Sequence, residues 1–158
     1  MTEHTPNILV YGYGNPGRQD DGLGVKLAES LEKWIADNHY SQVHTDSNYQ
    51  LNLEDVATIS AYDMVIFADA SKEDIPDFWF EPLEASDRVE FTMHAVSPAF
   101  ILHLCNQVFN HQPRAYLLHI RGYEWEFMDI MTDKAKKNLE AANDFLQVFL
   151  QNLIQSDG

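Results

Sequence analysis

The sequence predicts one α/β domain in three layers, with a twisted, mostly parallel sheet of about five strands and helices on both faces. Short, mainly apolar runs at residues 7–12 and 63–70 indicate strands that are buried on both faces. Amphipathic segments separate these runs, and alternation of strand and helix is typical of a parallel sheet. The 158 residues fit a single domain, which we place at residues 1–158.

The first half of the chain supplies three strands and two helices. The strand over residues 7–12 ends at a glycine. Residues 20–38 carry apolar side chains at helical spacing with charged side chains between them, which predicts an amphipathic helix. A strand over residues 42–46 and a short helix over 53–60 precede the strand over 63–70.

The second half begins with an acidic segment at residues 71–87. It contains Pro76 and Pro82, so we predict a loop with at most one edge strand. The remaining predicted elements are a strand over 88–93, a helix over 97–109, a strand over 115–122 and a helix over 132–154.

The chain is strongly acidic, with 10 Lys and Arg against 25 Asp and Glu and a formal charge of −15. Because a phosphate-binding surface must be cationic, this charge argues against nucleic acid or an anionic membrane as the main partner. The single cysteine, Cys105, excludes an intrachain disulfide and a thiolate metal cage. No stretch approaches the roughly 18 apolar residues of a membrane span, and no leader is visible, so we expect a cytoplasmic protein.

Gly12, Gly14 and Gly17 form a G-x-G-x-x-G pattern between the first strand and the first helix, which is also the pattern of dinucleotide-binding proteins. Phosphate binding needs free N–H groups and positive potential at the helix start. Here Pro16 has no N–H, and two aspartates place negative charge at that position. We therefore predict that no dinucleotide binds, and a nucleotide-dependent oxidoreductase stays as an alternative hypothesis.

Asp20 and Asp21 stand at the predicted start of the first helix, where we expect one of them to cap the helix. A pair is more than a cap requires, and open α/β sheets bind ligands at the carboxyl ends of their strands. Asp69 stands at the end of one predicted strand and His94 follows another, so a parallel sheet would bring them to the same edge as Asp21. Asp21, Asp69 and His94 offer two carboxylates and an imidazole, a set that suits a divalent ion with open coordination positions.

Other potential nucleophiles and ligands are weaker. His103, His111 and His119 are eight residues apart, a spacing that matches no zinc-hydrolase motif. Cys105 lies beside apolar residues on a predicted helix, so we expect a buried structural thiol.

Four segments together resemble the nickel-iron hydrogenase maturation proteases, over essentially the whole chain. The segments are Gly12-Tyr13-Gly14-Asn15, Asp20-Asp21-Gly22-Leu23-Gly24, Val65-Ile66-Phe67-Ala68-Asp69-Ala70, and His94 just ahead of Ser97-Pro98. Members of this family are endopeptidases that remove a short C-terminal extension from the hydrogenase large-subunit precursor after nickel has been inserted. The resemblance implies the same reaction here, with the precursor as partner and neither nucleic acid, membrane nor dinucleotide involved.

The resemblance also implies a division of roles among the motif residues. The precursor carries the nickel, which acts as a recognition element, and another divalent metal is a possible substitute in the site. The implied catalytic and metal-contacting residues are Asp21, Asp69 and His94. The implied substrate-binding residues are Gly14, Asn15, Asp20 and Asp46.

Two further hypotheses come from other classes of protein. A non-catalytic nickel-binding assembly factor would use the same ligands to dock the precursor without cutting it. A different metal-assisted peptidase or amidase would act on substrates that contain no nickel. Cleavage of a nickel-loaded precursor separates both from the maturation protease.

Overall fold

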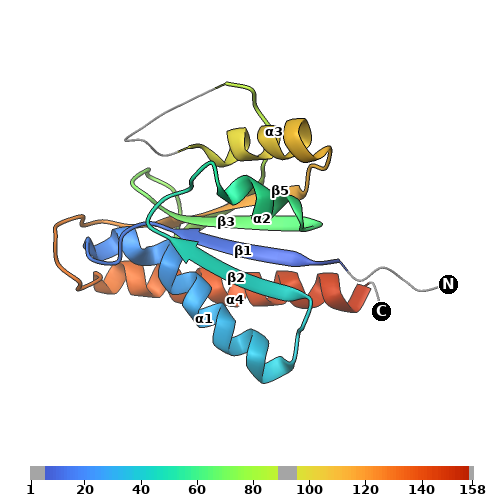
Figure 1. The fold of residues 1–158 in the computed structure, drawn as a ribbon. Helices are drawn as coiled ribbons and strands as arrows, with labels where there is room; N and C mark the ends of the chain where they lie inside the picture. Colours follow the sequence, from blue (N-terminus) through green and yellow to red (C-terminus); the bar gives the residue numbers. More distant parts are fainter. Residues whose placement is uncertain (1–5, 89–95, 157–158) are drawn as a thin grey trace.

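The computed structural model describes residues 6–88 and 96–156 and confirms the predicted architecture (Figure 1). Five strands form one sheet in the order β2-β1-β3-β5-β4. The first four are parallel, and β4 runs antiparallel to β5 at the edge. The bounds are β1 Ile8–Tyr13, β2 Val43–Asn48, β3 Met64–Ser71, β4 Phe78–Pro82 and β5 Arg114–Arg121.

The fifth strand is therefore the edge strand within the acidic segment, β4. Of the two prolines of the acidic segment, Pro76 precedes β4 and Pro82 is its last residue. Prolines are tolerated there because an edge strand has one unpaired side. The strand predicted over residues 88–93 lies almost wholly outside the described residues.

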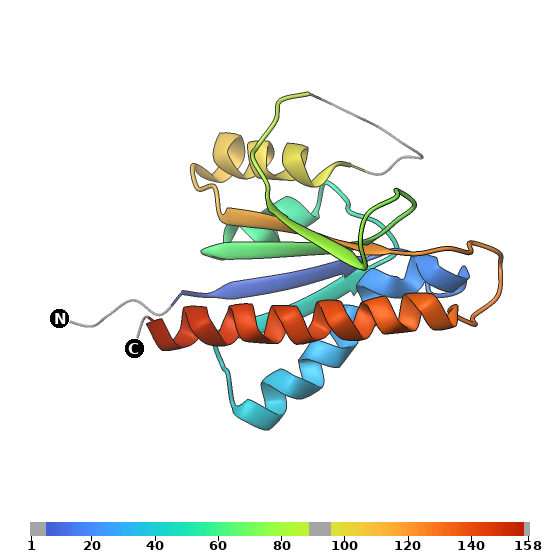
Figure 2. The same ribbon diagram turned by 180° about the vertical axis from the view of Figure 1, so that it is seen from behind.

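Two helices cover each face of the sheet (Figure 2). On one face lie α1 (Leu23–Asn38) and α4 (Asp133–Ser156), and on the other lie α2 (Asp55–Ser60) and α3 (Pro98–Phe109). The first helix begins three residues later than predicted, because residues Gln19–Gly22 form a separate 3-10 turn, η1. Gln19 has a φ of 46°, a left-handed conformation that no α-helix contains.

Alternation along the central strands divides the apolar side chains between two cores. Ile66 and Leu118 face α1 and α4, whereas Phe67 packs in the core under α2 and α3. Both cores are fully closed, which explains why these strands read as continuous apolar runs rather than alternating ones.

Gly12, the first glycine of the G-x-G-x-x-G pattern, and Gly24 in α1 allow the first helix to approach the sheet. A Cβ on Gly12 would overlap the carbonyl oxygen of Gly24, and a Cβ on Gly24 would overlap the carbonyl oxygen of Ala68. The start of α1 is thus packed directly on the backbone of β1 and β3.

The chain leaves β1 toward β2 on one side and later returns to β3 on the other side. Such a reversal of strand order opens a crevice at the carboxyl ends of the strands, which is the usual ligand site of open α/β sheets. Within the described residues, no helix is long and apolar enough to cross a membrane.

Candidate functional site

Asp21 and Asp69 meet at the carboxyl ends of β1 and β3, as predicted. Asp21 lies on η1, which follows β1 after the turn over residues 14–18, and Asp69 lies near the end of β3. Burial, followed by the negative charge of Asp21, raises the pKa of Asp69 from 3.8 to about 7. The two carboxylates are therefore close enough to repel each other.

His94, the third predicted ligand, lies outside the described residues. Among the residues that are described, no three His, Cys, Asp or Glu side chains form a group that could hold a metal ion. The two aspartates alone are thus an incomplete set of ligands, and further donors would have to come from elsewhere in the chain or from the substrate.

Tyr13 supports Asp69 from the neighbouring strand, a contact that the sequence analysis missed. Its hydroxyl donates a hydrogen bond to the Asp69 carboxylate, and burial together with that carboxylate raises the pKa of Tyr13 well above its usual value. The phenol therefore stays protonated and acts only as a donor. The strand register would have indicated this contact, because β1 and β3 pair through Gly12 and Ala68, the residues just before these two.

A row of polar and aromatic side chains continues from Asp69 across the sheet. Asp69 is paired with His119 on β5, and His119 is paired with Trp79 on β4. His119 Nε2 lies 3.3 Å from a carboxylate oxygen of Glu81. A cavity of about 440 Å³ is lined by His119, Glu81 and Trp79. His119, whose spacing from the other histidines matches no hydrolase motif, therefore lies in a pocket and is the strand partner of Asp69.

Gly14 and Asn15 shape the turn that holds Asp21. The Asn15 N–H donates to Asp21 Oδ2 at 2.9 Å, and Asn15 Oδ1 accepts from the Gly17 N–H at 2.8 Å. Gly14 has a φ of 135°, which favours glycine, and a Cβ there would overlap the carbonyl oxygen of Asp21. Gly14 also lines a cavity of about 270 Å³ together with Ser47, Asn48 and Tyr49. Contact of Gly14 and Asn15 with substrate stays a prediction.

Asp46 is exposed in the middle of β2, because that strand continues two residues beyond its predicted end. Its side chain accepts from the neighbouring Ser47 N–H at 2.8 Å. Its predicted substrate-binding role also stays a prediction.

Asp20 is a correction, since the structure gives it a structural role in place of substrate binding. Its side chain is 0% exposed and accepts four hydrogen bonds of 2.7–3.1 Å from residues of the β5–α4 connection. A carboxylate that is buried and saturated with donors cannot contact a substrate. The donors are the N–H groups of Tyr123, Glu124 and Thr132 and the Thr132 hydroxyl.

The predicted capping of the first helix by one of the two aspartates is also wrong, because no side chain caps η1 or α1. Asp20 instead binds Thr132, whose hydroxyl accepts from the Ala135 N–H in the first turn of α4. The helix that Asp20 stabilises is therefore the last one.

Cys105 is a buried structural thiol, as predicted. It lies in the core under α2 and α3 and its Sγ is 3.7 Å from the Val56 carbonyl oxygen. Burial raises the pKa of the thiol to about 11, so it carries no thiolate at neutral pH.

The Asp21–Asp69 pair has the chemistry of a cation site. Among residues 6–88 and 96–156, no lysine or arginine forms an ion pair with either carboxylate. A divalent cation would relieve their mutual repulsion, and carboxylate oxygens bind most divalent ions. The fold and this site define an α/β protein with a paired-carboxylate centre at the switch point of its sheet.

Solved structures that share this fold include several hydrogenase maturation proteases. The chain superposes on HycI from Thermococcus kodakarensis with a TM-score of 0.71 at 20% identity, covering 93% of this chain and 94% of that one. HybD, the hydrogenase maturating endopeptidase of Escherichia coli, gives a TM-score of 0.71 at 21% identity, with coverages of 92% and 93%. A hydrogenase 2 maturation peptidase from a Thaumarchaeota archaeon gives 0.63 at 18% identity, with coverages of 91% and 97%.

No family model matches the sequence, and no curated protein matches it significantly. The structural comparisons therefore establish the fold, and that fold is the one expected from the resemblance that the motifs indicated.

The opposite roles of the two adjacent aspartates lead to a first prediction. Asp20→Asn replaces one acceptor oxygen by a donor that faces N–H groups, so it should lower the free energy of unfolding by roughly 3 kcal/mol. Asp21→Asn keeps an acceptor for Asn15 and removes repulsion, so its stability should stay within about 0.5 kcal/mol of wild type or rise above it. Urea denaturation of both variants measures this, and equal destabilisation would show that we have misassigned Asp20.

The raised pKa of Asp69 leads to a second prediction, for the metal-free protein. As pH rises from about 4 to about 7, the unfolded chain loses a proton that folded Asp69 keeps, so stability falls through this window. Asp69→Asn removes that loss and should be more stable than wild type above pH 7, by on the order of 3 kcal/mol, with the difference vanishing near pH 4. Denaturation curves across this range test it, with exposed Asp144→Asn as control. A pH-independent difference would contradict it.

Proposed function

We propose that this protein is an endopeptidase that removes the C-terminal extension of a nickel-iron hydrogenase large-subunit precursor. The observation that carries the proposal is the Asp21–Asp69 pair at the sheet's switch point, on a fold whose solved examples include the maturation proteases above. In the glycine pattern that could suggest a dinucleotide site, Gly12 packs against α1 and Gly14 packs against the Asp21 carbonyl oxygen. The carboxylate of Asp21 also precedes the start of α1, where a phosphate would need positive potential, which favours this proposal over an oxidoreductase.

In this proposal nickel is part of the substrate. The precursor holds the ion through its own cysteines, and Asp21, Asp69 and His94 complete its coordination from the protease side. Recognition then depends on both partners, because the described residues of this chain supply only two of the donors. A precursor without nickel would lack the ion that joins the two surfaces.

The residues around the pair hold the carboxylates ready for an ion. The Asn15 N–H fixes Asp21, and the Tyr13 hydroxyl fixes Asp69. Each partner donates a hydrogen bond to a carboxylate oxygen and so holds that carboxylate in place. An ion held beside the scissile bond can polarise its carbonyl or lower the pKa of the attacking water.

We place the reaction in the cytoplasm, a reducing compartment in which a free thiol such as Cys105 is ordinary.

The test is cleavage of the precursor, read by intact mass. Nickel-loaded precursor should lose its extension, and nickel-free precursor should be cut at least about tenfold more slowly, because one coordination bond to the ion is worth more than the roughly 1.4 kcal/mol of a tenfold change. Asp21→Asn, Asp69→Asn and His94→Ala should each abolish most cleavage while the folded population stays intact. Asp21→Glu keeps the charge and should retain some activity, and Asp144→Asn is the matched surface control.

Three outcomes would reject the proposal in different ways. Tight binding of the nickel-loaded precursor without cleavage would indicate the non-catalytic assembly factor. Equal cleavage of nickel-free precursor would indicate a peptidase that does not recognise nickel. Undiminished cleavage by His94→Ala would remove His94 from the ligand set.

A further inference from the structure

We propose that the connection between β5 and α4 is the surface on which the folded part of the precursor docks. We call residues 123–131 the docking loop. This inference rests on the proposed function. It predicts that the docking surface of the precursor is an apolar patch bordered by lysine or arginine side chains.

The docking loop displays large apolar side chains to solvent. Phe127 is 82% exposed, Ile130 64% and Met128 49%, so three such residues lie within four positions of one another. Single exposed apolar residues are ordinary, but a contiguous group of large ones marks an interaction site. Phenylalanine and methionine are also enriched in protein interfaces.

The loop is held rigidly despite this exposure. Gln19, which is buried, donates its N–H to the Met128 carbonyl oxygen at 2.8 Å and accepts the Glu126 N–H on its side-chain oxygen at 3.0 Å. Its side-chain nitrogen donates to the Ile130 carbonyl oxygen at 3.2 Å. Asp20 fastens both ends of the same segment, so the apolar side chains project from an ordered backbone and little ordering entropy is lost on binding.

Arg18 fixes the most exposed side chain directly. Its guanidinium donates to the Trp125 carbonyl oxygen at 3.1–3.2 Å and stacks 5.0 Å from the centre of the Phe127 ring. A cation placed against one face of the ring holds that ring in place without burying its other face.

The docking loop and the Asp21 site share one support. Arg18, Gln19 and Asp20 bind the loop, and Asp21 is the next residue along the chain. Both the β1–α1 turn and the docking loop lie at the same end of the sheet (Figure 1). A protein seated on the loop would therefore lie at the same end of the sheet as the Asp21–Asp69 pair.

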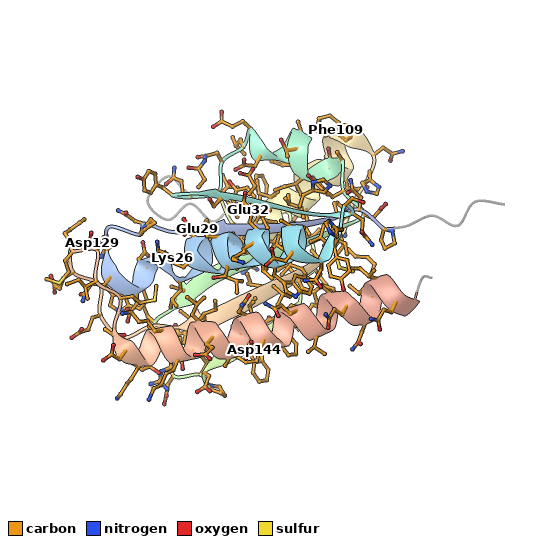
Figure 3. All side chains as sticks on the ribbon, turned by 90° about the horizontal axis from the view of Figure 1, so that it is seen from below. Lys26, Glu29, Glu32, Phe109, Asp129 and Asp144 are labelled. Carbon is orange, nitrogen blue, oxygen red and sulfur yellow. The ribbon has the colours of Figure 1, made fainter. Side chains whose placement is uncertain are left out.

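Charge specifies the rest of the partner. The docking loop itself contains Glu124, Glu126 and Asp129, all exposed, and no lysine or arginine. The cations that lie over its aromatic rings are Arg18, Lys72, Arg121 and Lys134, and within the described residues none of them forms an ion pair with these three carboxylates. Figure 3 shows Asp129 at the outer edge of the molecule, at the same end as the start of α1. An interface that combines exposed carboxylates with apolar side chains is complementary to an apolar patch with a basic border.

The experiment compares Phe127→Ser/Ile130→Ser with the matched control Val108→Ser/Val148→Ser, which removes exposed apolar side chains of α3 and α4. The probe is nickel-loaded precursor with its extension, from the chain's own source organism. The loop variant should raise the Kd, and the KM for cleavage, by about tenfold or more, with kcat at saturation and Tm unchanged. The control should match wild type.

Charge reversal gives an independent arm. Glu126→Lys/Asp129→Lys should slow association with the precursor and weaken its dependence on salt. An unchanged Kd in the loop variant, an equal loss in the control, or wild-type self-association through this loop in analytical ultracentrifugation would overturn the inference.

The two proposals fail separately in these measurements. If wild type cuts the precursor and the loop variant binds it normally, the docking surface is wrong and the proposed function stands. If wild type binds without cutting and the loop variant loses binding, the proposed function is wrong and the docking surface stands.

Discussion

The hydrogen bonds of the buried Asp20 carboxylate hold together the edge of the sheet at which the parallel strands end. It accepts four hydrogen bonds from the β5–α4 connection, and it therefore joins the turn after the first strand to the start of the last helix. The cost of burying a negative charge is offset because every donor is in place. That bond network fixes η1, and η1 carries the neighbouring Asp21.

Neighbouring aspartates thus differ in what surrounds them. Asp20 has its charge satisfied by the protein, whereas Asp21 and Asp69 face each other without a described cation between them. Burial and then the charge of Asp21 raise the pKa of Asp69, so ionising Asp69 at neutral pH opposes the stability of the metal-free fold. Groups that oppose stability in this way are typical of functional sites, where the missing interaction is supplied by a ligand.

Much of the fold was predictable, because apolar runs and helical spacing are local signals. The pairing of Asp21 with Asp69 was predictable as well, since the carboxyl ends of parallel strands meet at one edge. The role of Asp20 was not, because its donors lie 103, 104 and 112 positions away in the chain. Predicting the Tyr13 contact would have required the strand register. The late start of α1 follows from the left-handed backbone conformation of Gln19, a conformation that glutamine seldom adopts.

The proposed function requires that the paired carboxylates of this chain bind the nickel that the precursor presents. The most direct test is nickel K-edge X-ray absorption of the nickel-loaded precursor, measured before and after mixing with the wild-type protein. We expect added oxygen or nitrogen neighbours at about 2.1 Å on mixing. A nickel spectrum that stays unchanged while the precursor is bound and cut would contradict the claim.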